Sequence, residues 1–66
     1  MYHFDKEAMM YVETGYGFNP NNSTVNEVKG IDPYGRLIMD AMVFRGTWEE
    51  CMEFVKQAKR KKNHGI

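Results

Sequence analysis

Few side chains in this chain of 66 residues could carry out a reaction. Cys51, the only cysteine, lies in the first turn of an expected helix, where the helix dipole would stabilise a thiolate. It also lies on the apolar stripe of that helix, and the sequence places neither His3 nor His64 near it. We therefore expect a buried structural cysteine and not a nucleophile.

A metal site would have to be assembled from the same small set. A tetrahedral site needs four ligands, and one cysteine with a histidine near each terminus does not supply them. His3, Asp5 and Glu7 alternate, which would place them on one side of a strand. Solvated polar residues explain this pattern more simply, so we expect no metal and no cofactor.

The remaining candidates are carboxylates and a glycine-containing loop. Glu49, Glu50 and Glu53 are explained by helix capping and by the positive end of the helix dipole. Asp40 interrupts an apolar run, and we expect it to be exposed or paired with a base. The segment 15–17 lacks the lysine and the flanking elements of a nucleotide-binding loop. The residues predict a chain that is not an enzyme by itself.

A helix is predicted after Thr47. Apolar residues recur there at spacings of three and four, at Trp48, Cys51, Met52, Val55 and Ala58. Thr47 is a favourable N-cap, and Glu50 completes a capping box. The helix should end near Lys62, which leaves 63–66 as a frayed tail.

Strands are predicted before this helix. Leu37–Phe44 is apolar on both faces apart from Asp40, as expected of a central strand. The sequence Asp-Pro-Tyr-Gly at 32–35 favours a tight turn, whose partner strand Thr24–Ile31 has the irregular pattern of an edge. Residues 8–14 favour a strand, although a short helix over 5–12 is an alternative, and 15–22 is a loop.

These elements predict one α+β domain spanning residues 1–66, with 1–62 folded. Its architecture would be β-β-β-α, a three-stranded antiparallel sheet with one C-terminal helix packed on one face. The predicted core, unless the central strand presents its opposite face, is Met10, Val12, Val28, Leu37, Met39, Ala41, Val43, Trp48, Met52 and Val55.

The distribution of charge along the chain, and the features that indicate a cellular compartment, limit the partners that we expect. The net charge is zero, but all nine acidic residues precede Lys56, whereas 56–66 carry only basic charge. A lone cysteine, with no basic and apolar leader at the N-terminus, is typical of a cytoplasmic protein in a bacterial or infected host cell. The run 37–44 is too short to span a bilayer, so no membrane partner is expected.

The leading hypothesis is a non-enzymatic module that binds another protein. The expected anchors are the loop aromatics Tyr16, Phe18 and Tyr34. Glu13, Glu27 and Asp32 would form an acidic rim suited to a basic partner surface. An edge strand would also permit a homodimer.

The alternative hypothesis is a small nucleic-acid-binding protein. Basic residues in the last helical turns would contact phosphates, at Lys56, Lys59, Arg60, Lys61 and Lys62.

Residues 42–56, MVFRGTWEECMEFVK, resemble a pattern in very small phage-encoded proteins. In that pattern a strand ending in an aromatic residue leads into a capped helix of the form T-x-E-E-x-x-E-F. The resemblance implies an origin in a phage or mobile element and a role as an inhibitor or adaptor that binds a host protein. It implies no catalytic residue.

Overall fold

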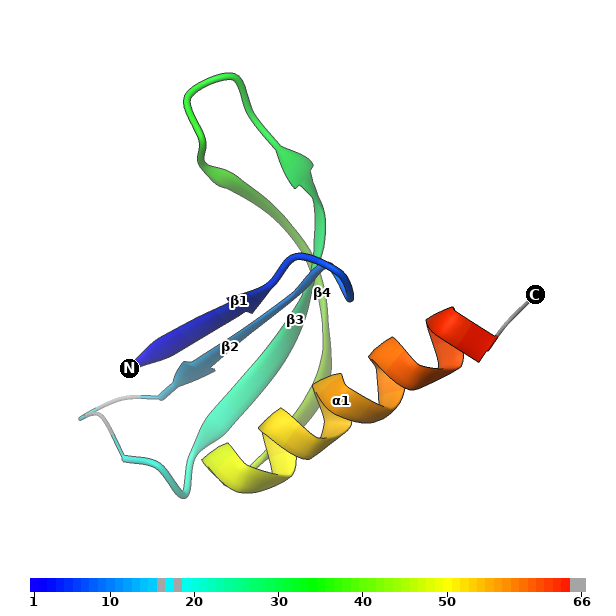
Figure 1. The fold of residues 1–66 in the computed structure, drawn as a ribbon. Coiled ribbons are helices and arrows are strands. Elements are labelled where there is room, and N and C mark those ends of the chain that lie inside the picture. Colours follow the sequence, from blue (N-terminus) through cyan, green and yellow to red (C-terminus); the bar gives the residue numbers. More distant parts are fainter. Residues whose placement is uncertain (16, 18, 65–66) are drawn as a thin grey trace.

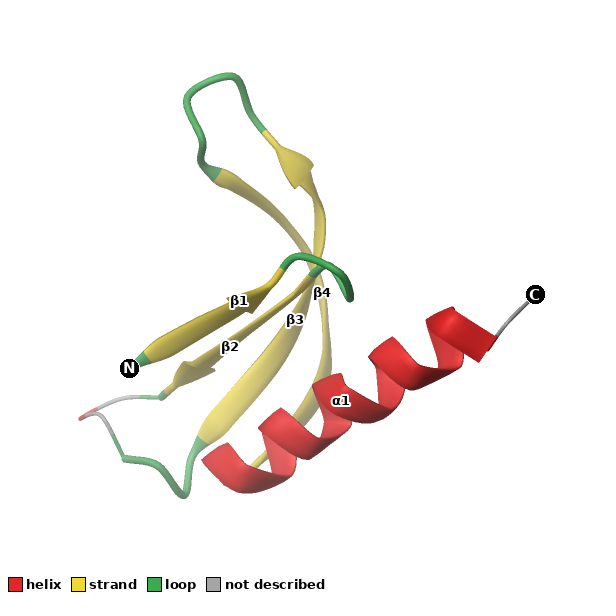
Figure 2. Cartoon of the chain, viewed as in Figure 1, coloured by secondary structure: helices red, strands yellow, loops and turns green. Residues whose placement is uncertain are grey.

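The chain folds as an antiparallel meander followed by one helix (Figures 1 and 2). The structure, a computed structural model, describes residues 1–15, 17 and 19–64, the last three of these by their backbone alone. The strands β1 (Tyr2–Asp5), β2 (Met10–Thr14), β3 (Ser23–Ile31) and β4 (Leu37–Gly46) lie side by side in chain order, and α1 (Trp48–His64) follows. The α+β class with a C-terminal helix is confirmed, whereas the expected three strands are wrong, because there are four.

The additional strand is β1, which pairs with β2 from Tyr2 opposite Glu13 to Asp5 opposite Met10. Residues 6–9 connect the two strands without glycine or proline. Met9 takes the left-handed conformation that glycine usually supplies, with φ of 52°. The Asp5 carboxylate accepts a hydrogen bond from the Ala8 N–H at 3.0 Å and so stabilises the turn. The alternative of a helix over 5–12 is therefore wrong.

The predicted positions of the two hairpin strands in the sheet are reversed, because 24–31 was expected at the edge and 37–44 in the centre. β3 lies inside the sheet between β2 and β4, and β4 is the edge. The pairing of β2 with β3 stops at Met10 opposite Glu27, so the hairpin continues past the rest of the sheet (Figure 1). We call this projecting part, together with the residues of β4 that lead into it up to Met42, the arm (residues 29–42).

The core lies under α1 at the other end of the sheet. Val12, Val25 and Cys51 are fully buried, and Val55 is nearly so. Phe44 of β4 stacks on Phe54 of α1 with ring centroids 4.8 Å apart.

The predicted core is confirmed where α1 covers the sheet and wrong along the arm. Val12, Val28 and Val55 are buried, whereas Met39 and Ala41 are exposed. The alternative, in which the opposite face of this strand is buried, is also wrong, because Ile38 and Met42 are exposed as well. α1 packs against the Val43–Phe44 end of β4, and nothing among the described residues covers the part of the strand beyond it.

Two local predictions are confirmed. Glu50 N–H donates to Thr47 Oγ1 at 3.1 Å, and Thr47 N–H donates to Glu50 Oε1 at 2.9 Å, which is a capping box. At the arm tip the Gly35 N–H donates to the Asp32 carbonyl at 3.0 Å, and Gly35 has φ of 83°. Within the described residues, no helix is long and apolar enough to cross a bilayer.

Candidate functional site

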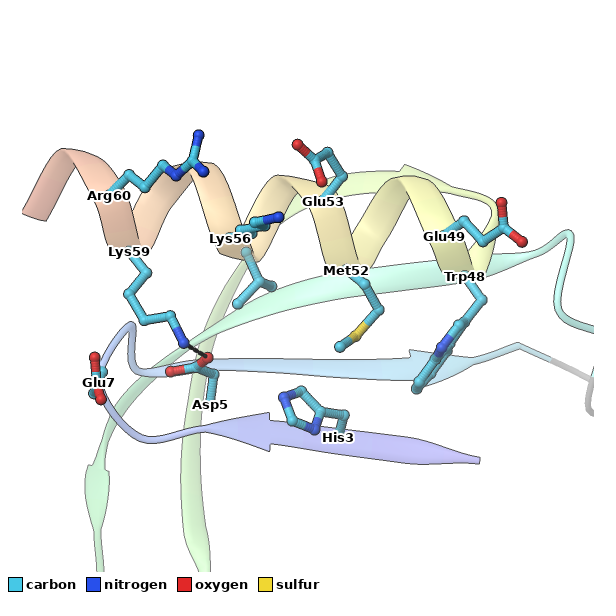
Figure 3. Close-up of a pocket in the computed structure, with 11 residues that line it drawn as sticks. His3, Asp5, Glu7, Trp48, Glu49, Met52, Glu53, Lys56, Lys59 and Arg60 are labelled. Carbon is cyan, nitrogen blue, oxygen red and sulfur yellow. Dashed lines mark hydrogen bonds and ion pairs between the residues drawn. The ribbon is translucent and has the colours of Figure 1, made fainter.

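A groove of about 810 Å³ runs between α1 and β1 on the helix-covered face of the sheet (Figure 3). It exists because α1 packs over β2, β3 and β4 and leaves β1 beside it. Trp48 and Met52 point from the helix toward the sheet, and His3 rises from β1 toward them. The groove thus has apolar side chains and one imidazole between the helix and the sheet, with charged side chains around them, and its size suits a small ligand or part of a partner.

One end of the groove is closed by an ion pair. Lys59 Nζ lies 3.0 Å from Asp5 Oδ2, and the two side chains are 35% and 12% exposed. Burial opposes ionisation of Asp5, but the Ala8 N–H and the Lys59 ammonium outweigh it and lower the pKa of the carboxyl. The Asp5 carboxylate in turn raises the pKa of Lys59. This pair ties the β1–β2 turn to the helix.

The groove offers little for chemistry among the described residues. Its lining contains no cysteine, serine or threonine that could act as a nucleophile. No hydrogen bond from a described residue orients the His3 side chain, and no group of three or more potential metal ligands occurs in the described part of the chain. The arrangement is suited to binding.

Cys51 lies in the core and not in the groove, as expected of a structural cysteine. Burial raises the pKa of its thiol, and Glu50 adds to this effect. A protonated, buried thiol is a poor nucleophile.

The arm is the second candidate surface. Ile31, Ile38, Met39 and Met42 are each between 41% and 56% exposed, and Tyr34 at the tip is 82% exposed. Asp40, which we expected to be exposed or paired, is exposed. The arm therefore concentrates large apolar side chains in water, which is uncommon on a surface without a partner.

The arm tip is held together by contacts of the Asp32 carboxylate. Asp32 Oδ1 accepts hydrogen bonds from the N–H groups of Tyr34 and Arg36, both at 2.9 Å. Asp32 Oδ2 forms an ion pair with Arg36 Nε at 3.0 Å, and the Arg36 guanidinium lies 5.3 Å from the Tyr34 ring centroid. These contacts lower the pKa of Asp32, with the Arg36 N–H as the first cause.

The protein-binding residues predicted from the sequence are not brought together. Tyr16 and Phe18 lie outside the described residues. Tyr34 and Asp32 share the arm tip, whereas Glu13 and Glu27 are exposed far from it on β2 and β3. Because Val12 faces the core and Glu27 is in register with Met10, Glu13 and Glu27 also lie on opposite faces of the sheet.

The basic residues of the alternative hypothesis are divided as well. Lys56 and Arg60 are exposed on the rim of the groove, and Lys61 is exposed elsewhere on the helix. Lys59 is paired with Asp5. The side chain of Lys62 lies outside the described residues.

Sequence reasoning did not find either surface. The groove requires β1, whose turn carries no glycine or proline signal. The arm follows from strands of nine and ten residues beside a neighbour of five, a difference that the predicted ranges 8–14, 24–31 and 37–44 do not contain.

Comparisons with protein-family models, with curated proteins and with solved structures found no match.

Proposed function

We propose that this chain is a protein-binding module that docks a partner protein on the arm. The observation that carries the proposal is the exposure of Ile38, Met39 and Met42 along one edge strand, where the neighbours Ile38 and Met39 point to opposite faces of the sheet. Apolar side chains gathered in this way gain free energy when a partner removes them from water.

The energy available from these three residues is substantial. Burying an Ile or Met side chain fully is worth about 1.5–3 kcal/mol, so covering the half that is exposed is worth about 1 kcal/mol each. A partner that covers all three residues, and so contacts both faces of β4, gains about 3 kcal/mol, which corresponds to roughly a hundredfold in the dissociation constant. The arm can therefore act as the centre of an interface.

The edge of β4 adds a means of recognition. Its outer backbone N–H and C=O groups face no strand in the described chain, because β4 is the last strand of the sheet. An extended segment of a partner can pair with such an edge, with backbone hydrogen bonds for affinity and apolar side chains for specificity. The opposite edge is less suitable, since β1 has only four residues and carries His3 and Asp5.

The role of an inhibitor or adaptor for a host protein, which the resemblance to small phage-encoded proteins implies, is compatible with docking on the arm. The basic partner surface expected from Glu13, Glu27 and Asp32 receives less support. Asp32 is engaged by Arg36, and the two glutamates lie away from the arm.

Nucleic-acid binding is the less favoured function. Lys59 is occupied by Asp5, and Lys56 and Arg60 share the groove rim with Glu49 and Glu53. Carboxylates beside the bases would repel a phosphate backbone.

The test compares the wild-type protein with an arm variant, Ile38→Thr/Met39→Thr/Met42→Thr. Threonine retains β propensity while removing apolar surface. Affinity capture from a bacterial lysate, read by quantitative mass spectrometry, should show proteins that bind the wild type and are lost with the arm variant.

The matched control is Tyr2→Thr, which removes an exposed aromatic residue outside the arm. This variant should retain the captured proteins. Equal capture by the wild type and the arm variant would contradict docking on the arm. Salt-sensitive binding to oligonucleotides, unaffected by the arm substitutions, would favour the alternative function.

A further inference from the structure

Four charged residues form a stripe along the open side of the groove. Glu49, Glu53, Lys56 and Arg60 follow one another at spacings of four, three and four, so they lie on one side of α1. All four line the groove and are exposed (Figure 3). We call them the charged stripe; its first half is acidic and its second half basic.

The charged stripe places like charges next to each other within a single molecule. Glu49 and Glu53 are like charges four residues apart, and so are Lys56 and Arg60, a spacing at which like charges destabilise a helix. Among the described residues, Glu49, Lys56 and Arg60 have no ion pair, and Glu53 accepts a hydrogen bond only from Gln57, at 2.9 Å. Most of the stripe is therefore available to charges outside the chain.

The order of the charges along the stripe is complementary to the same stripe on an antiparallel second copy. When a second copy of α1 lies antiparallel beside the first, with the two-fold axis between Phe54 and Val55, Glu49 lies opposite Arg60 of the second copy. In the same register Glu53 lies opposite Lys56 of the second copy. Both pairs occur twice by symmetry, so four ion pairs form and all four like-charge contacts are offset.

We propose that the groove receives α1 of a second copy of this chain in this antiparallel register. Helices packed in this way also align their dipoles favourably. The second helix would cover Trp48 and Met52, which are only half-buried against the small core of a single chain. Small domains without disulfides commonly gain stability by such self-association.

The charge pattern favours a second copy over other occupants. A polyanion would be attracted by Lys56 and Arg60 but repelled by Glu49 and Glu53. Glu7 and Asp5 lie at the basic end of the groove, but Lys59 neutralises Asp5, so that end stays net positive. The two-fold axis would also give the dimer two arms, and the inference does not depend on what the arms bind.

The test uses two variants with stripes of uniform charge. Glu49→Lys/Glu53→Lys makes the stripe basic, and Lys56→Glu/Arg60→Glu makes it acidic. Sedimentation equilibrium should show the wild type dimerising and each variant with a dissociation constant raised at least about tenfold. An equimolar mixture of the two variants should dimerise again, and the association should weaken with added salt.

Lys61→Glu is the matched control, because it reverses one charge on α1 outside the groove. It should dimerise like the wild type. Charge reversal also disturbs the helix dipole, so circular dichroism must show that each variant is folded. The milder Glu49→Gln/Glu53→Gln variant keeps the measurement decisive if a reversed variant unfolds, since it too should weaken the dimer.

Three outcomes would overturn the proposal. The first is a wild type that stays monomeric at the highest concentration reached. The second is a mixture of the charge variants that associates no better than either alone. The third is a dimer that still forms in both stripe variants but not in the arm variant, because the dimer interface would then lie on β4.

Discussion

Substituting threonine at two positions of the same hairpin tests whether α1 covers one end of it and leaves the other in water. Val25 is fully buried, in register with Val12 and Phe44, whereas Ile38 is 45% exposed on the arm. Val25→Thr keeps the side-chain shape but places a hydroxyl in the core, which costs about 1–3 kcal/mol. Ile38→Thr leaves its hydroxyl in water and should cost about 0.5 kcal/mol or less.

These differences are large against the total stability. A chain of 66 residues has a free energy of unfolding of roughly 3–10 kcal/mol. At about 4–8 °C per kcal/mol, a loss of about 2 kcal/mol lowers the melting temperature by about 10 °C. Val25→Thr should therefore melt well below Ile38→Thr, which should stay close to the wild type.

Thermal and urea unfolding followed by far-ultraviolet circular dichroism measure both effects. Low protein concentrations keep self-association from altering the midpoints. The description of the arm is refuted if Ile38→Thr destabilises the protein as much as Val25→Thr does, because Ile38 would then be part of a core.

Three further predictions concern the capping box, the ion pair and the thiol. Thr47→Ala removes the N-cap and should lower the free energy of unfolding by about 1 kcal/mol in urea titrations, and an unchanged midpoint would contradict the capping role. The pKa of Asp5 is lowered in the folded state, so its carboxylate stabilises the fold above pH 3.8 and this stabilisation is lost as the pH falls through the folded-state pKa. Asp5→Asn should therefore flatten the acid end of the plot of unfolding free energy against pH. A plot parallel to that of the wild type would count against the Lys59 contact. Cys51 should react with a thiol reagent at pH 7 only at the rate of unfolding, whereas rapid labelling of folded protein would show that the thiol is accessible.

Local signals in the sequence predicted local structure well. Thr47 and Glu50 identified the start of α1, and the sequence at 32–35 identified the hairpin turn, because each depends on a few neighbouring residues. β1 was not predicted, because its turn places Met9 in the left-handed conformation and residues 6–9 contain no glycine or asparagine that would indicate such a turn.

Burial along β4 could not be predicted in the same way. Ile38, Met39 and Met42 have the residue types of a core strand, and only the position of α1 decides that they remain in water. The groove could not be predicted for the same reason. From the sequence alone, Glu49, Lys56 and Arg60 are ordinary charges near the ends of a helix, and only the position of β1 beside α1 makes them part of a groove.

Site-specific photo-crosslinking tests docking on the arm most directly. A diazirine side chain at position 38 is compared with one at position 57, which is exposed on α1 outside the arm. Position 38 should crosslink to a discrete protein in the lysate, and excess unlabelled wild type, but not the arm variant, should compete. The same crosslinked proteins from both positions, or crosslinks from position 38 to nucleic acid alone, would contradict the proposed function.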